Sequence, residues 1–276
     1  MPHLLAPLIL LLVFLPGQLS AQTFKCGSFP LLDDSLPEQQ RAEVLMKRGA
    51  ICVREGKPLQ SIAVFSELIG LQPENMLAYL NRGNAYLQGS QFELGIADFS
   101  HVIAMQPRMA EAWYNRGTAF IAARHYDRAI GDLNEAIRLN PSLGQAYCNR
   151  GFALLHKSAY DRALADLNLG IAKNANLAFC YYGRGEVHIR QGAYQKAIDD
   201  LTEGLRLRPN VQGLTTRGQA YERLGAREKA LADFNAALEL TPEHRDAKEG
   251  AKRLSKGPQP QGDTGLGAQE IQGGKQ

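Results

Sequence analysis

The most constraining feature of the sequence is a period of about 34 residues. Residues 110–143 read AEAWYNRGTAFIAARHYDRAIGDLNEAIRLNPSL, and the same pattern returns before and after them. A glycine recurs once in each period, with the last step one residue shorter than the others, at Gly49, Gly83, Gly117, Gly151, Gly185 and Gly218. A proline closes most units, at Pro73, Pro107, Pro141, Pro209 and Pro242, and Ala175 stands where one is missing. Such a period predicts a stack of small structural units rather than one globular core.

Each unit has the pattern of two helices joined by a tight turn. In residues 110–143, apolar residues recur at three-to-four spacing on both sides of Arg124-His125. Asn140-Pro141 ends the second helix, because proline cannot donate the next hydrogen bond and restricts the residue before it. The recurring glycine, with a small residue such as Ala129, is expected to let the two helices approach closely. The units are expected at about 42–75, 76–109, 110–143, 144–177, 178–210 and 211–244.

These residues resemble a known repeat. Trp113-x-x-Arg116-Gly117-x-x-Phe120, followed by Ala129-x-x-x-Leu133 and Pro141, is similar to the tetratricopeptide repeat, and the likeness covers roughly 200 of the 276 residues in six tandem copies. The resemblance implies an all-α, right-handed α-solenoid of six helix-turn-helix repeats. It also implies that the first helix of every pair lines a concave groove.

The two ends of the repeat domain, expected at 36–254, differ from its interior. Ser35-Leu36-Pro37-Glu38 has the form of a capping box and predicts a first helix over about 36–54. Residues 22–35 before it are expected to form a short extended lead. Residues 245–254 predict a polar helix that caps the last repeat. Residues 255–276, rich in Gly, Gln and Pro, are expected to be disordered.

The first 21 residues have the form of a cleaved secretory signal. An apolar run over Leu4–Leu15 is followed by Pro16 and Gly17 and then by Leu19-Ser20-Ala21. We therefore expect export, to the periplasm or outside the cell. The competing interpretation is a wrongly assigned start or an apolar tail.

Export would place the four cysteines in an oxidising compartment. A disulfide between Cys26 and Cys52 would close a loop of about 26 residues and stabilise the fold by roughly 3 kcal/mol. Cys148 and Cys180 fall near each other in repeat register, but the sequence does not give their distance. The alternative is four free, buried thiols. No CxxC motif and no Cys/His cluster occurs, so we expect no metal site.

One departure from the family pattern is systematic. The family prefers leucine just before the repeat glycine, whereas this chain has arginine there in all six units: Arg48, Arg82, Arg116, Arg150, Arg184 and Arg217. An aspartate follows the small residue of the second helix by three positions in five units: Asp98, Asp132, Asp166, Asp200 and Asp233. The first unit has Val64 instead. This pattern predicts a structural ladder of Arg–Asp ion pairs where helices pack. The alternative is a row of arginines that binds phosphate.

Residues just ahead of the arginine are expected to face the concave groove. Asn81, Asn115 and Asn149 would form three rungs whose amides can hold the main chain of an extended peptide. They resemble the asparagine ladder of O-linked N-acetylglucosamine transferases, at these positions only. Leu80, Tyr114 and Tyr182 would add apolar and amphipathic surface. The alternative is that asparagine simply tolerates a half-exposed inner face.

Composition and motifs exclude several other functions. The formal net charge of +3 is too small to favour nucleic acid. No HExxH, Walker-type loop or G-x-S-x-G elbow occurs, and we expect no enzyme activity, no cofactor and no small-molecule substrate. The sequence thus predicts a non-catalytic scaffold that binds a peptide segment of another protein in its groove, in the assembly of an exported or envelope complex. It would contact a membrane only through that partner. The alternative is a structural subunit of an envelope complex that uses its convex or edge surface.

Overall fold

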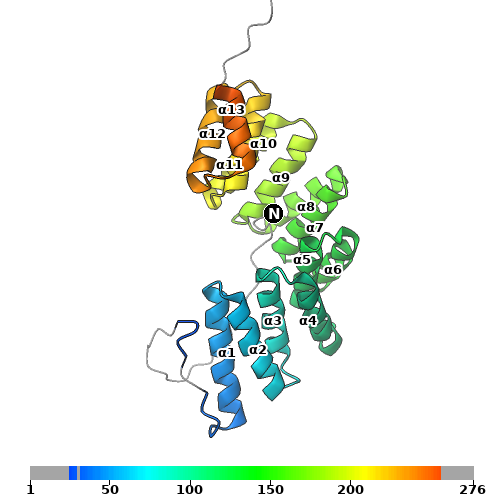
Figure 1. Ribbon diagram of the computed structural model, residues 1–276. Coiled ribbons are helices and arrows are strands. Elements are labelled where there is room, and N and C mark those ends of the chain that lie inside the picture. The colour runs from blue at the N-terminus through cyan, green and yellow to red at the C-terminus, as the bar shows by residue number, and fades with distance from the viewer. Residues whose placement is uncertain (1–24, 30–31, 256–276) are drawn as a thin grey trace, which may run out of the picture. The chain divides into compact units, whose positions relative to one another are not determined.

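The computed structural model describes residues 25–29 and 32–255, which contain thirteen α-helices and no strand (Figure 1). The helices are α1 (Glu38–Arg54), α2 (Pro58–Leu71), α3 (Met76–Gln88), α4 (Phe92–Met105), α5 (Ala110–Ala122), α6 (Tyr126–Leu139), α7 (Gly144–His156), α8 (Tyr160–Lys173), α9 (Ala178–Arg190), α10 (Tyr194–Leu207), α11 (Val211–Arg223), α12 (Arg227–Leu240) and α13 (Arg245–Ser255). The predicted all-α helical solenoid is confirmed. The expected signal segment, residues 1–21, and residues 256–276 of the expected tail lie outside the described part.

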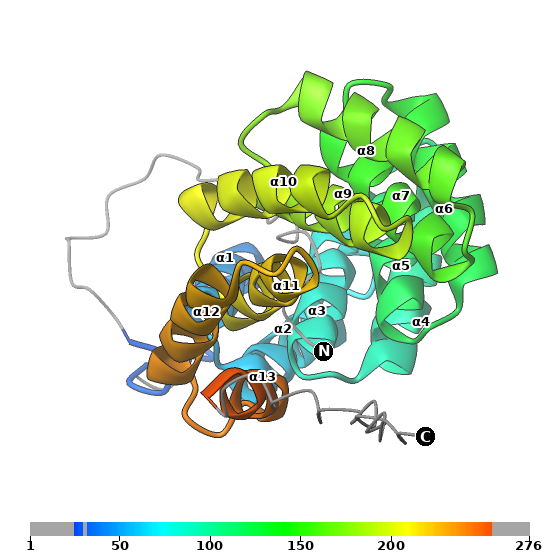
Figure 2. The same cartoon turned by 90° about the horizontal axis from the view of Figure 1, so that it is seen from above.

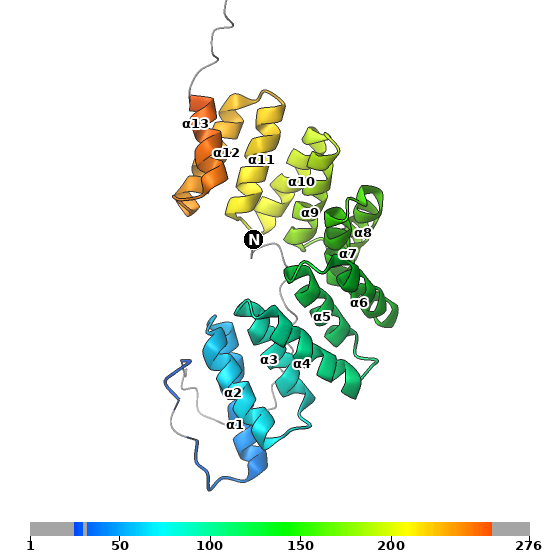
Figure 3. The same cartoon turned by 45° about the vertical axis from the view of Figure 1, so that its right-hand side comes forward.

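The helices form two compact units. The first ends at Pro209 and holds five helical hairpins, α1–α2 to α9–α10; the second begins at Asn210 and holds the hairpin α11–α12 with α13. We call the first helix of each hairpin the A helix and the second the B helix. Within the first unit, Figure 2 shows the B helices α4, α6 and α8 outside the A helices α3, α5 and α7, and Figure 3 shows the hairpins side by side in chain order.

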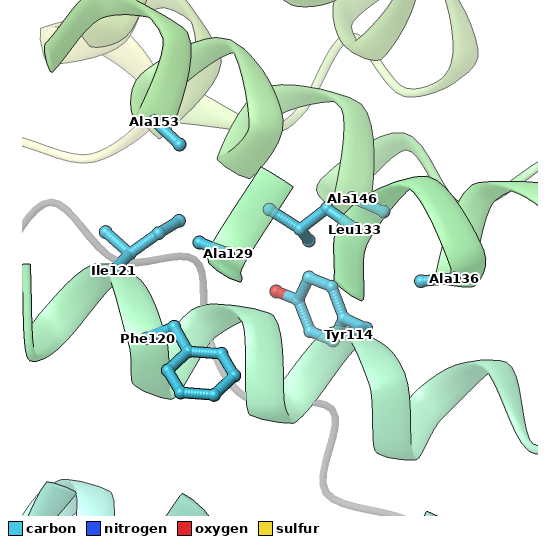
Figure 4. Packing of buried hydrophobic residues seen from close by; sticks show 8 residues of the cluster. All are labelled: Tyr114, Phe120, Ile121, Ala129, Leu133, Ala136, Ala146 and Ala153. Atoms are coloured by element: carbon cyan, nitrogen blue, oxygen red, sulfur yellow. The ribbon is translucent and has the colours of Figure 1, made fainter. Parts of the chain in front are cut away.

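The repeat glycine allows the two helices of a hairpin to touch. A Cβ atom at Gly83 would lie 2.6 Å from Cε1 of Phe99 on the facing B helix, and one at Gly117 would lie 2.9 Å from Cγ of Leu133. Real side chains do not approach so closely, so a larger residue would push the hairpin apart. Ala129 faces the same contact and is fully buried (Figure 4). The predicted close approach is therefore confirmed.

Each A helix passes into its B helix through one residue in the left-handed region. These residues are Gly56, Ser90, Arg124, Ser158, Gly192 and Gly225, with φ between 58° and 73°. Glycine adopts this conformation without the clash that a Cβ atom causes. The turns lie where the sequence predicts them.

The start of α1 differs from its prediction. The helix begins at Glu38, and its N-cap, Pro37, makes no side-chain capping bond. Ser35 instead belongs to a turn before the helix, in which its hydroxyl donates to Oδ1 of Asp33 at 2.6 Å. The predicted capping box is wrong because the N-cap position is held by Pro37, so Ser35 lies two residues before it.

The predicted capping helix is present as α13. It packs on the last hairpin so closely that a Cβ atom at Gly250 would lie 2.6 Å from the ring of Phe234, and Ala247 is fully buried. The helix thereby covers the apolar side that a terminal repeat would otherwise expose. None of the described helices is both long enough and apolar enough to cross a membrane.

Candidate functional site

The predicted Arg–Asp ladder is present in five hairpins. The pairs are Arg82–Asp98, Arg116–Asp132, Arg150–Asp166, Arg184–Asp200 and Arg217–Asp233, with shortest N–O distances between 2.6 and 2.8 Å. Nε and Nη2 of each guanidinium donate to the carboxylate of the facing B helix, which is the bidentate geometry typical of arginine. The aspartate side chains are only 8–9% exposed. The ladder therefore joins the A and B helices inside the protein.

The remaining guanidinium nitrogen, Nη1, reaches the preceding hairpin. It donates to a side-chain oxygen on the B helix 16 residues earlier; the acceptors are Ser66 for Arg82, Ser100 for Arg116, Asn134 for Arg150 and Asn168 for Arg184, at 2.6–3.1 Å. Each of these arginines thus joins three helices. With their donors used in this way, these four arginines are structural, which argues against a phosphate site. In the first hairpin the guanidinium of Arg48 lies 5.3 Å from the centre of the Phe29 ring.

All four cysteines form disulfides. Cys26 and Cys52 are bonded with their Cα atoms 4.8 Å apart, which ties the lead segment to α1. Cys148 on α7 and Cys180 on α9 are bonded with their Cα atoms 5.2 Å apart, which ties two neighbouring hairpins together. The alternative of four free thiols is wrong.

Three of the expected groove residues are core residues. Tyr114 is fully buried with Leu133 and Ala136 (Figure 4), and this burial raises the pKa of its hydroxyl, against a smaller lowering by Thr118 and Asn149. Leu80 is buried between hairpins. Tyr182, which holds the position of Tyr114 two repeats later, is a core residue too.

Tyr182 is also buried. Its ring is so close to α10 that a Cβ atom at Gly204 would lie 2.8 Å from Cε1, and its hydroxyl donates to the carbonyl of Arg208 at 2.5 Å. The prediction that Leu80, Tyr114 and Tyr182 line an open groove is wrong. Leu80 and Tyr114 point at the adjoining B helix and the next hairpin, and Tyr182 points at its own B helix, α10.

The three asparagine rungs are buried as well, and two of them are satisfied within the protein. Nδ2 of Asn149 donates to Oγ1 of Thr118 at 2.9 Å, and Nδ2 of Asn81 lies 3.6 Å from Sδ of Met46. In both cases the amide of one A helix contacts the A helix before it. Asn81 and Asn149 are therefore contacts between hairpins, and the prediction that they form open rungs is wrong.

Asn115 differs, and with Asn84 it leaves hydrogen-bonding capacity unused. Asn84 and Asn115 hold the same two places as Thr118 and Asn149, one repeat earlier. Both side chains are fully buried, and within the described part of the chain neither amide has a hydrogen-bond partner. An unpaired buried polar group costs about 1–3 kcal/mol. Sequence reasoning missed Asn84. The signal that could have revealed it is the presence of asparagine at both 84 and 115, where the next repeat has Thr118 and Asn149.

Glu111 extends this set of unpaired groups. It lies one helical turn before Asn115 on α5, and its buried Oε1 has no hydrogen-bond partner among the described residues. Loss of hydration raises the pKa of the carboxyl group from 4.5 to about 7. We call Asn84, Glu111 and Asn115 the unpaired patch. It offers amide donors, amide acceptors and a carboxyl group that holds its proton to near neutral pH.

Comparisons with known proteins identify the repeat. A tetratricopeptide repeat model matches residues 46–100, 83–142 and 114–178, and a second model of this repeat matches 178–211 and 211–244. None of the curated proteins matches the chain.

Solved structures share the fold. A tetratricopeptide repeat protein from Parabacteroides merdae ATCC 43184 is 21% identical with a TM-score of 0.65, over 78% of this chain and 84% of that one. PilF of Pseudomonas aeruginosa is 15% identical with a TM-score of 0.65, over 78% and 99%. MamA of Desulfovibrio magneticus RS-1 is 16% identical with a TM-score of 0.53, over 60% and 94%. At these identities the likeness concerns the fold alone.

Proposed function

Because the chain belongs to the tetratricopeptide repeat family, a fold of protein–protein interaction scaffolds, we propose that it is a non-catalytic scaffold that holds a peptide segment of a partner protein. The peptide would lie along the A helices α3 and α5 at Glu111, the partly exposed member of the unpaired patch, and it would reach the fully buried amides of Asn84 and Asn115 only where α3 and α5 move apart. This position revises the expected groove, since all six of its residues, Asn115 included, are buried, and the prediction that they line an open surface is wrong.

The observation that carries the proposal is the unused hydrogen-bonding capacity of Asn84 and Asn115. A main chain presents one donor and one acceptor at each residue, and an asparagine amide can match both without reading the peptide's side chains. Glu111, whose pKa is raised to about 7 by loss of hydration, adds a donor for a carbonyl group in its protonated form. A bound peptide would remove the free-energy cost of leaving these groups unpaired, and this gain supports binding at the patch.

We further propose that the protein acts outside the cytoplasm, in the periplasm or beyond the cell. Its two disulfides support this location, because disulfides persist in oxidising compartments and are rare in the cytosol. The apolar run of residues 4–15 followed by Leu19-Ser20-Ala21 supports it independently. In this setting the scaffold would help to assemble an exported or envelope complex.

A structural subunit that uses its outer surface is the second candidate. It is favoured by three leucines on B helices of the first unit, Leu59, Leu94 and Leu169, which are 68%, 49% and 46% exposed. Scattered exposed leucines are common on soluble proteins, whereas buried unpaired amides are rare. We therefore rank this candidate below peptide binding.

The test is a comparison of partner recovery by matched asparagine variants. The exported protein is used as bait on envelope extracts, with crosslinking and mass spectrometry, as wild type, as Asn84→Ala/Asn115→Ala and as the control Asn81→Ala/Asn149→Ala. We expect the first variant to lose the partner and the control, whose amides have partners within the protein, to retain it. Equal recovery by all three would reject the patch and support the outer surface.

A further inference from the structure

One A-to-B turn differs from the others in its chemistry. At the left-handed position of the turn, five hairpins have glycine or serine, whereas the hairpin α5–α6 has Arg124, with φ at 63°. A Cβ atom is unfavourable there because it crowds the following carbonyl oxygen, at Ser90 and Ser158 as well as at Arg124, so the feature that sets this turn apart is its long, charged side chain. Strained backbone positions cluster at functional sites, and the side chain of Arg124 is therefore a candidate for a binding role.

Arg124 lines a hollow between two adjacent turns of the first unit. The hollow has a volume of about 400 Å³ and is lined by Arg124, His125, Tyr126, Asp127, Arg128 and Lys157. Its wall is held in place by ring contacts, since Tyr126 stacks on His156 with the ring centres 4.6 Å apart and the guanidinium of Arg128 lies 5.8 Å from the centre of the Phe120 ring. The hollow is thus built by α6 and the two turns rather than by one mobile side chain.

Positive charge in the hollow is only partly neutralised. Nζ of Lys157 contacts Oδ2 of Asp127 at 3.0 Å, and this aspartate is the only carboxylate of the lining. Among the described residues neither Arg124 nor Arg128 has an ion pair. By contrast, the exposed Arg138 on the same helix, α6, is paired with Glu135 at 2.5 Å. Two arginines are therefore available to an anionic group from another molecule.

We propose that this hollow docks an acidic segment of a partner protein, with neighbouring Asp or Glu side chains bound by Arg124 and Arg128. Charge complementarity carries the proposal, and a guanidinium binds a carboxylate bidentately. A nucleic acid fits less well, because a phosphate backbone needs an extended basic track and the whole chain has a formal charge of only +3. The site is separate from the unpaired patch and does not depend on it.

The turn geometry provides a variant with opposite effects on stability and binding. Arg124→Gly relieves the backbone and removes the charge, so we expect a Tm higher by about 2–4 °C together with weaker binding. Ser158→Gly makes the same backbone change without a change of charge. Arg108→Gln removes an exposed arginine from a B-to-A turn, at the other end of the helices. These two variants are the controls.

Binding is measured by fluorescence anisotropy with a labelled octaglutamate peptide at about 50 mM salt. We expect Arg124→Gly/Arg128→Gln to bind at least about tenfold more weakly than the wild type, and both controls to bind like the wild type. We also expect Arg124→Glu/Arg128→Glu to gain binding to octalysine. The proposal is overturned if the wild type does not bind octaglutamate, if Arg108→Gln weakens binding as much as Arg124→Gly/Arg128→Gln, or if the wild type prefers a single-stranded oligonucleotide of equal charge.

Discussion

The ion-pair ladder can be tested within a single helix. On α6, Asp132 pairs with the partly buried Arg116, and three residues later Glu135 pairs with the exposed Arg138. Asp132 is 9% exposed and its pair joins two helices, whereas the side chain of Arg138 is 67% exposed. Substitution by the matching amides, Asp132→Asn and Glu135→Gln, removes one charge from each pair and keeps its shape.

The structure sets the expected sizes of the two effects. Breaking a fully buried pair costs about 3–5 kcal/mol, and because the guanidinium of Arg116 keeps some contact with water we expect Asp132→Asn to lower the free energy of unfolding by about 2–3 kcal/mol. Exposed pairs contribute little, so Glu135→Gln should cause no measurable loss. The assay is a urea titration followed by far-ultraviolet circular dichroism, with equal slopes in all variants. Equal effects of the two substitutions would refute the ladder as a buried link between helices.

Two further predictions concern stability. Because the pKa of Glu111 is raised from 4.5 to about 7 in the folded protein, its ionisation destabilises the fold as the pH rises through that window. Urea titrations should therefore show Glu111→Gln equal to the wild type near pH 4 and more stable by about 1 kcal/mol near pH 8, a value reduced for solvent screening; equal stability at both pH values would show that Glu111 is well hydrated. The Cys148–Cys180 disulfide closes a segment of 32 residues, so Cys148→Ala/Cys180→Ala should lose about 3–4 kcal/mol in urea titrations, and unreduced wild-type protein should show no free thiol after denaturation. Two free thiols in that assay would contradict one disulfide, and four would contradict both.

Much of the fold could be predicted from the sequence because one pattern recurs six times. Apart from the longer α1, each copy gives the same helix lengths, the same glycine contact, as at Gly83 and Phe99, and the same turn. The Arg–Asp pairs were predictable for the same reason, since two charged residue types recur together and can satisfy each other. The acceptors that complete four of these arginines were missed because their type is not constant: it is serine in the first two cases, as at Ser100, and asparagine in the next two, as at Asn134.

The inner surface could not be placed from the sequence. The helical period gives the side of the A helix on which Tyr114 lies, but its exposure depends on how far the next hairpin covers it. Asn149 likewise lies on the predicted face of its A helix, but its amide donates to Thr118 of the preceding A helix and is not open to a peptide. Asn84 was missed because only the register of two adjacent A helices brings it to the level of Asn115. Contacts between repeats decide these cases, and they are not encoded in any single repeat.

The most direct test of the account is to find which side of the A helices the partner touches. A photoreactive benzoylphenylalanine replaces Gln145, which occupies the register position of Glu111 one repeat further along the chain; in a second variant it replaces Leu169, exposed on the B helix α8. We predict that irradiation with the partner gives a crosslinked product from position 145 and none from position 169. A product from position 169 alone would contradict peptide binding along the A helices.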